Sequence, residues 1–193
     1  MYKELLSAIA IIITFIAFMP YIRSILKSQT KPHVFSWIIW GSTTFVVFLA
    51  QLADEGGAGA WPIGVSGLIT IYVACLAYIK KSDITITRSD WIFFVIAMSA
   101  IPFWYFTSDP LWAVLVLTAV DIAGFGPTFR KAYIKPFEEN LTFYTLFVIR
   151  NSISIMALTN YSLTTVLFPA AIAIVTSAFI VTVMYRRQQV TYQ

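Results

Sequence analysis

Two charged residues stand inside long apolar stretches of the sequence. Asp121 lies near the middle of segment 111–132, and Arg150 lies near the middle of segment 141–159. A lone ion at the centre of a lipid bilayer costs at least about 2.5–3.5 kcal/mol on insertion scales, so such residues pair or line a water-filled cavity. We predict that Asp121 and Arg150 face one another or share one cavity. The sequence leaves two roles open for these residues. They could form a structural ion pair between two helices, or they could bind a solute or a proton.

Aromatic and polar side chains recur at helical spacing in two apolar segments. At about 100° of rotation per residue, the members of each stripe share one helix face. The stripes are Trp37, Trp40 and Thr44 in segment 34–53, and Tyr144, Phe147 and Asn151 in segment 141–159. Aromatic planes beside hydrogen-bonding groups suit a small polar solute with an apolar face. We predict that these six residues bind a solute together with Asp121 and Arg150; the alternative is helix packing or contact with lipid.

Two prolines interrupt apolar segments near one predicted membrane surface. Pro20 and Pro127 each remove a backbone hydrogen bond and bend a helix. Because the two recur at equivalent positions of the chain, we predict that they are hinges for alternating opening. A static kink is the alternative.

The composition excludes an ordinary soluble domain. Of 193 residues, 59% are hydrophobic and only 11% are charged, and the mean hydropathy is +0.80. A bilayer core about 30 Å thick needs roughly 20 apolar residues of helix, and lipid-facing backbone must satisfy its own hydrogen bonds. We therefore predict an all-α membrane protein with seven transmembrane helices. The predicted spans are about 5–26, 34–53, 60–80, 89–107, 111–132, 141–159 and 162–185.

The charges predict the orientation. Most of the 13 Lys and Arg residues lie in alternate connections and in the C-terminal tail. They are Arg23, Lys27, Lys31, Lys80, Lys81, Arg88, Arg130, Lys131, Lys135, Arg186 and Arg187. The opposite connections carry Asp54, Glu55 and Asp109. By the positive-inside rule, the N-terminus lies outside and the C-terminus lies in the cytoplasm, and we expect the plasma or inner membrane.

The chain contains a weak internal repeat at one constant offset. The matched pairs are Phe18 with Phe125, Pro20 with Pro127, Arg23 with Arg130, Ala50 with Ala157, Pro62 with Pro169 and Tyr78 with Tyr185. At the same offset, Thr14 and Thr43 replace Asp121 and Arg150, so both charges are absent together from the first half.

This repeat predicts three units. They are a first three-helix repeat over residues 1–82, a linker helix over 83–108 and a second three-helix repeat over 109–193. The single linker helix gives both repeats the same orientation, as in transporters built from parallel repeats.

Several short stretches resemble the PQ-loop and SWEET transporters, although neither repeat carries a Pro-Gln dipeptide. The stretches are Phe18 to Arg23, Lys27 to Thr30 and Ser36 to Gly41, with a looser second copy from Gly126 to Arg130. The resemblance implies two three-helix bundles, each packed in the order first, third, second, with a solute path between them.

The first expectation for function is therefore a facilitator or proton-coupled carrier. It would move a small polar metabolite, such as a sugar, an amino acid or a vitamin, by alternating access. The alternative is a non-transporting membrane receptor or sorting protein of the same fold. The sequence has no metal-ligand cluster, nucleophile elbow or phosphate-binding loop, so we expect no enzyme, cofactor or metal. We expect a small-molecule solute and the lipid bilayer as partners, without nucleic acid; assembly into a homo-oligomer is open.

Overall fold

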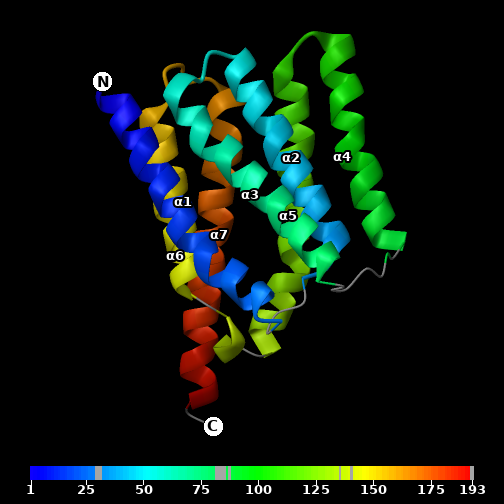
Figure 1. Cartoon of the computed structure of the whole chain (residues 1–193), viewed down its shortest axis with the longest axis vertical. Helices are drawn as coiled ribbons and strands as arrows, with labels where there is room; N and C mark the ends of the chain where they lie inside the picture. The colour runs from blue at the N-terminus through cyan, green and yellow to red at the C-terminus, as the bar shows by residue number, and fades with distance from the viewer. Residues whose placement is uncertain (29–31, 81–85, 87, 135, 140, 192–193) are drawn as a thin grey trace.

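The computed structural model of the chain is all-α (Figure 1). It describes every residue except 29–31, 81–85, 87, 135, 140 and 192–193, and it also leaves the side chains of 89, 90, 127, 130, 131, 138 and 191 undescribed. The predicted cytoplasmic charges Lys31, Lys81 and Lys135 lie outside the described residues. The elements are α1 (Tyr2–Leu26), α2 (Val34–Ala53), the short 3-10 helix η1 (Gly57–Ala60), α3 (Trp61–Ile79), α4 (Arg88–Thr107), α5 (Pro110–Ile134), η2 (Pro136–Glu138), α6 (Leu141–Ala157) and α7 (Leu163–Thr191).

Each predicted apolar segment corresponds to one α-helix. The segment predicted at 34–53 coincides with α2, which His33 caps by accepting a hydrogen bond from the Ser36 amide at 3.4 Å. The largest difference is at α7, which continues beyond the predicted end at 185 to Thr191. Arg187 in this extension donates to the Pro136 carbonyl at 3.0 Å, so hydrogen bonding to the chain around η2 supports the helix there.

Four of the helices are long and apolar enough to cross a membrane. They are Tyr2–Leu26, Val34–Ala53, Gly57–Ile79 and Leu163–Val190. The shorter apolar helices Trp91–Thr107, Pro110–Gly126 and Leu141–Ala157 accompany them. These features suggest an integral multi-pass membrane protein, whereas the full number of seven spans remains a prediction.

The faces of α1 are arranged as lipid requires. Its exposed side carries large apolar residues, including Ile9, Ile12 and Ile16, whereas Ser7 and Thr14 are buried. Helices of water-soluble proteins show the opposite arrangement, with polar residues outward. An outward apolar face with small and polar residues inside is typical of a helix that packs in a membrane.

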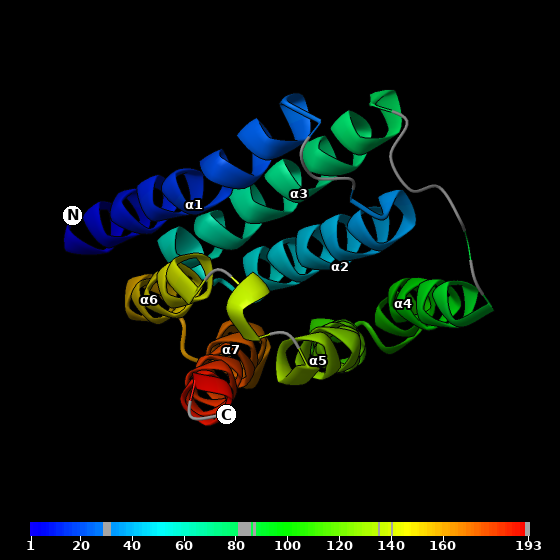
Figure 2. The same cartoon turned by 90° about the horizontal axis from the view of Figure 1, so that it is seen from below.

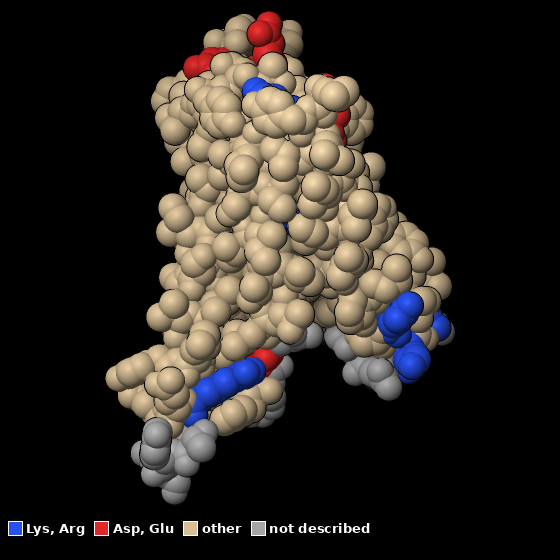
Figure 3. Space-filling model, turned by 90° about the vertical axis from the view of Figure 1, so that its left-hand side faces the viewer, with Lys and Arg blue, Asp and Glu red and all other residues tan. Residues whose placement is uncertain are grey.

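Charged side chains avoid the middle of the molecule. Figure 3 shows a broad middle band on one face that is almost free of them. Most acidic atoms lie at the end where α1 begins, and most basic atoms lie near the opposite end. This distribution agrees with the predicted orientation, in which the basic end faces the cytoplasm.

The helices form two rows. In the first row α3 lies between α1 and α2, and in the second row α7 lies between α5 and α6 (Figure 2). The rows meet where α1 packs against α6 and α2 packs against α5 and α7, and α4 packs against α5 and α2. We call the contact surface between the two rows the seam.

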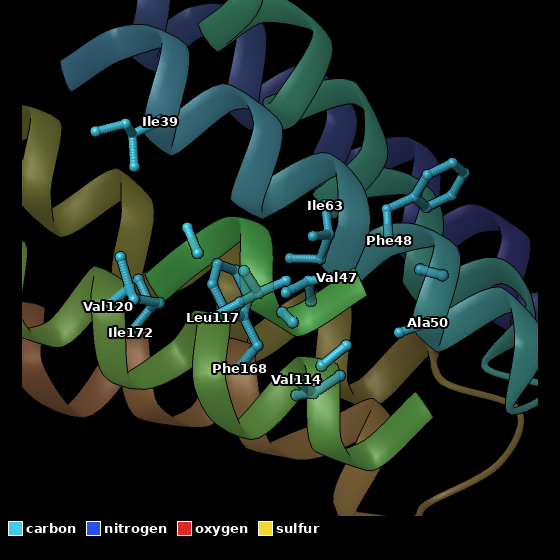
Figure 4. Close-up of a cluster of buried hydrophobic side chains, with 14 residues drawn as sticks. Ile39, Val47, Phe48, Ala50, Ile63, Val114, Leu117, Val120, Phe168 and Ile172 are labelled. Atoms are coloured by element: carbon cyan, nitrogen blue, oxygen red, sulfur yellow. The ribbon is translucent and has the colours of Figure 1, made fainter. Parts of the chain in front are cut away.

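A buried apolar cluster fills part of the seam. Figure 4 shows that it joins side chains of α2, such as Val47, to Leu117 of α5 and Phe168 of α7. All three are at least nine-tenths buried. In lipid, such side chains hold helices together by van der Waals packing, so this cluster joins the rows beside the polar residues described below.

Candidate functional site

Asp121 lies at the seam and is held by a residue of the other row. Its side chain is 8% exposed, and its Oδ1 accepts a hydrogen bond from the Thr43 hydroxyl at 3.0 Å. Thr43 Oγ1 also lies 3.0 Å from the Trp40 carbonyl oxygen, which competes for the same proton. The hydrogen bond therefore joins α5 to α2 near the middle of both helices.

Arg150 is buried on the face of α6 that is directed at the first row. Its side chain is 2% exposed, and its Cζ lies 4.9 Å from the centre of the Phe147 ring. On the same face, the Phe147 ring lies 5.5 Å from the ring of Phe18 in α1. Further along this face, a Cβ added to Gly59 of η1 would lie 2.6 Å from the Ser154 carbonyl oxygen. Arg150 thus lies between two points at which α6 touches the first row.

The guanidinium of Arg150 lacks hydrogen-bond partners in the described part of the chain. Both Nε and Nη1 are buried and unpartnered. A buried donor without an acceptor costs about 1–3 kcal/mol, and more when the group is charged. Such a cost in a native fold calls for an explanation, such as a ligand that is bound during function.

Among the described residues, Asp121 and Arg150 do not form an ion pair with each other. The physical reason is the position of α7, which packs between α5 and α6 and keeps the two charges at different helix contacts. That Asp121 and Arg150 share one cavity remains a prediction.

Three of the predicted aromatic residues belong to one continuous aromatic cluster. Ring centres are 5.9 Å apart for Trp37 and Trp40, and 6.4 Å apart for Trp37 and Phe18. Phe18 then contacts Phe147 across the seam, while Tyr21 of α1 stacks on Trp37 at 4.9 Å. The prediction from sequence did not include Phe18 or Tyr21 in the site, although both belong to the stretch that carries the resemblance to known transporters.

Tyr144 lies at the edge of this cluster. Its ring lies 4.4 Å from the ring of Phe179 in α7, and its hydroxyl donates to Glu139 at 3.2 Å. The Phe143 ring connects it to the other aromatic residues, because it lies 5.4 Å from Tyr144 and 6.0 Å from Phe18. Tyr144 therefore packs against α7 and also extends the aromatic cluster.

The remaining predicted ligands are buried. Thr44 is 8% exposed and Asn151 is fully buried. The Asn151 amide donates to the Phe147 carbonyl at 2.9 Å, and its Oδ1 has no partner within the described residues. Asn151 thus has a buried acceptor that no described residue satisfies.

Trp40 of α2 approaches α5 at a glycine. A Cβ added to Gly124 of α5 would lie 3.0 Å from Trp40 Nε1, so a glycine lets the indole approach that helix. Nothing in the sequence pattern pointed to Gly124.

The two prolines predicted as hinges lie inside helices. Pro20 lies inside the continuous helix α1. Pro127 lies within α5, and its side chain is outside the described residues. The hinge role of both prolines remains a prediction.

Hydrogen bonds join the two rows at the predicted outer end. The Ser162 hydroxyl donates to the Asp54 carboxylate, and the Asn160 amide donates to the Asp54 carbonyl at 3.0 Å. The Thr159 amide donates to the Gly56 carbonyl at 2.9 Å. We call this set, Asp54 and Gly56 with Thr159, Asn160 and Ser162, the outer seal.

Removing the Thr43 hydroxyl tests the contact between α2 and α5. We expect Thr43→Val to lower the free energy of unfolding by about 1–3 kcal/mol, because a buried oxygen of Asp121 loses its donor. Thermal unfolding in one detergent measures the change. Thr14→Val is the matched control, since the Thr14 hydroxyl donates within its own helix, to Ala10 at 2.8 Å. Equal losses for both variants would show that the contact between the helices adds nothing.

No protein-family model matches the chain, and no curated protein or solved structure is significantly similar to it. In the part of the chain that the structure describes, no three His, Cys, Asp or Glu side chains form a group that would hold a metal ion.

Proposed function

We propose that this protein carries a small polar metabolite across the membrane by alternating access. The site lies at the seam, at the level of Asp121 and Arg150. The observation that carries the proposal is that both ionisable side chains are buried midway along helices, between two rows of helices, and do not pair with each other. Ionisable residues at membrane depth mark solute or proton pathways.

The order of the helices supports a chain of two parallel repeats. α3 lies between α1 and α2 as α7 lies between α5 and α6, and the contact of α1 with α6 has its counterpart in that of α5 with α2. With α4 as the linker, this is the plan of seven spans that the resemblance to PQ-loop and SWEET transporters implies. Solute sites of such transporters lie near the midplane, between the repeats.

The two ends of the seam differ in a way that suits alternating access. The outer seal joins the rows by hydrogen bonds between loops. Toward the predicted cytoplasmic end, Phe18 meets Phe143 and Phe147 through apolar ring contacts, with ring centres 6.0 and 5.5 Å apart. Both ends are in contact in this structure, so in the proposed cycle the outer seal and the aromatic contacts open in turn, and Pro20 and Pro127 absorb the bending.

A reversible lock on the outer seal tests this cycle. The variant combines Asp54→Cys with Ser162→Cys, whose native side chains are hydrogen-bonded, and Cys75→Ser, which removes the one native cysteine. A disulfide needs Cβ atoms about 3.5–4.5 Å apart, which a small shift of these loops allows. Uptake of labelled sugars, amino acids and vitamins is measured in proteoliposomes. We expect oxidation to stop uptake and a reducing agent to restore it.

The single-cysteine variants are the matched controls, because oxidation leaves them unlocked. Uptake that continues in the fully oxidised double variant would contradict opening at the outer seal. If the unlocked protein binds a solute of this panel but never releases it inside the vesicle, the carrier proposal is wrong. A receptor or sorting protein then takes its place.

A further inference from the structure

We propose that the solute is an organic monocarboxylate with an apolar body, and that its carboxylate binds Arg150. This inference rests on the proposed solute site at the seam and adds the chemical class of the ligand. The observation behind it is Arg150, which is 2% exposed and has unpartnered Nε and Nη1 atoms, on a helix face directed at the other row.

The surroundings of Arg150 favour an anion. Within the described residues it forms no ion pair, and Asp121 is engaged by Thr43 instead. Truncation of either partner of a buried pair leaves the other charge uncompensated and strongly destabilising. The described residues supply no negative partner at this site, so a ligand is the natural source of it.

The orientation of the guanidinium favours a carboxylate. Its Cζ lies over the Phe147 ring, 4.9 Å from the ring centre, and a cation–π contact of this kind occupies no acceptor for the N–H donors. A planar guanidinium presents its edge donors as a fork that matches the two oxygens of a carboxylate. Next to it on α6, the unpartnered Oδ1 of Asn151 is available to a donor group of the solute.

The charge count favours one carboxylate on an apolar body. The other Lys and Arg residues that the structure describes lie near helix ends or in connections, so Arg150 is the cation that the described residues supply at this depth. A phosphate dianion would leave a net negative charge there. The rings of Phe18, Phe143 and Phe147 border the same region, with Phe143 and Phe147 at 4.6 Å between centres. They suit an apolar chain or an aromatic ring behind the carboxylate.

Binding to the detergent-solubilised full chain tests the proposal. The probes are benzoate, phenylacetate and hexanoate, each compared with its neutral amide, and inorganic phosphate. Thermal shift and calorimetric titration report affinity. We expect at least one carboxylate to bind at least tenfold more tightly than its amide. Arg150→Gln should abolish that tenfold preference, and Arg150→Lys should keep part of it because the charge remains.

Arg23→Gln is the matched control, because Arg23 is an exposed arginine of α1 and should leave the preference unchanged. The inference is overturned if none of the three carboxylates is preferred over its amide, if phosphate is preferred to all of them, or if Arg150→Gln keeps the preference.

Uptake in proteoliposomes separates this inference from the proposed function. Carboxylate binding that depends on Arg150, without uptake of the labelled carboxylate, would support the ligand class and contradict the carrier. Uptake of neutral solutes without any carboxylate preference would support the carrier and contradict the ligand class.

Discussion

Replacing Arg150 by methionine is expected to make the protein more stable while removing its capacity to bind an anion. The side chain is 2% exposed, and its Nε and Nη1 lack acceptors among the described residues. A charge at mid-membrane depth costs about 2.5–3.5 kcal/mol on insertion scales, and methionine fills a similar volume without that cost. We expect a gain of about 2–3 kcal/mol in the free energy of unfolding. Thermal unfolding of the detergent-solubilised variant measures it.

Arg187→Met is the matched control and should act in the opposite direction. Arg187 donates to the carbonyls of Pro136 at 3.0 Å and Glu139 at 2.7 Å. Loss of these hydrogen bonds should lower stability by about 1–3 kcal/mol. If Arg150→Met unfolds at a lower temperature than the parent protein, Arg150 contributes to the fold, and the argument for an absent ligand fails.

This pair of results would distinguish a functional charge from a structural one. A structural arginine repays its burial through hydrogen bonds, as Arg187 does through two carbonyls. An arginine kept for a ligand destabilises the empty protein and is compensated when the ligand binds. The carboxylates that bind through Arg150 should therefore raise the melting temperature of the parent and leave that of Arg150→Met unchanged.

Adding one methyl group at Gly59 should damage the outer end of the molecule. A Cβ there would lie 2.5 Å from the Leu158 amide nitrogen and 2.6 Å from the Ser154 carbonyl oxygen. Because both are backbone atoms at the end of α6, η1 must move away from that helix. Overpacking of this kind costs about 1–3 kcal/mol, and we expect a loss of that size for Gly59→Ala. Thermal unfolding measures it.

The same substitution should loosen the outer seal, which lies beside Gly59 in the chain. With Ser162→Cys as a reporter in the Cys75→Ser background, a water-soluble thiol reagent should react faster when Gly59→Ala is present. Gly126→Ala is the matched control, since a Cβ at Gly126 has no neighbour within 4 Å. It should add about 0.5–1 kcal/mol through the lower flexibility of alanine in a helix. Equal effects of the two alanines would mean that the contact of η1 with α6 is unimportant.

The sequence by itself determined where the helices lie. Lipid allows only backbone that satisfies its own hydrogen bonds, so an apolar segment of sufficient length must be helical whatever its neighbours are. The segment at 34–53 therefore became α2 without adjustment. The end of α7 was not predicted. This helix continues past Tyr185 because hydrogen bonds from Arg187 support it outside the apolar stretch.

The spacing of residues also predicted Asp121, Arg150 and Asn151 as members of the site, and all three are buried. Helical periodicity gives the face of a helix on which a residue lies. It does not give the helix that lies opposite, because that depends on how distant segments pack. The predicted site therefore included Trp37 of α2 and Phe147 of α6, but omitted Phe18 of α1, whose ring contacts both.

Only the tertiary structure decided the partners. α7 packs between α5 and α6, so Asp121 meets Thr43 of α2 instead of Arg150, and Tyr144 packs on Phe179 of α7. Hydrophobic periods and insertion energies are properties of single segments, whereas the choice of neighbour is a property of all segments packed together. For that reason the sequence predicted two buried charges at the membrane midplane, and the fold determined that they do not neutralise each other.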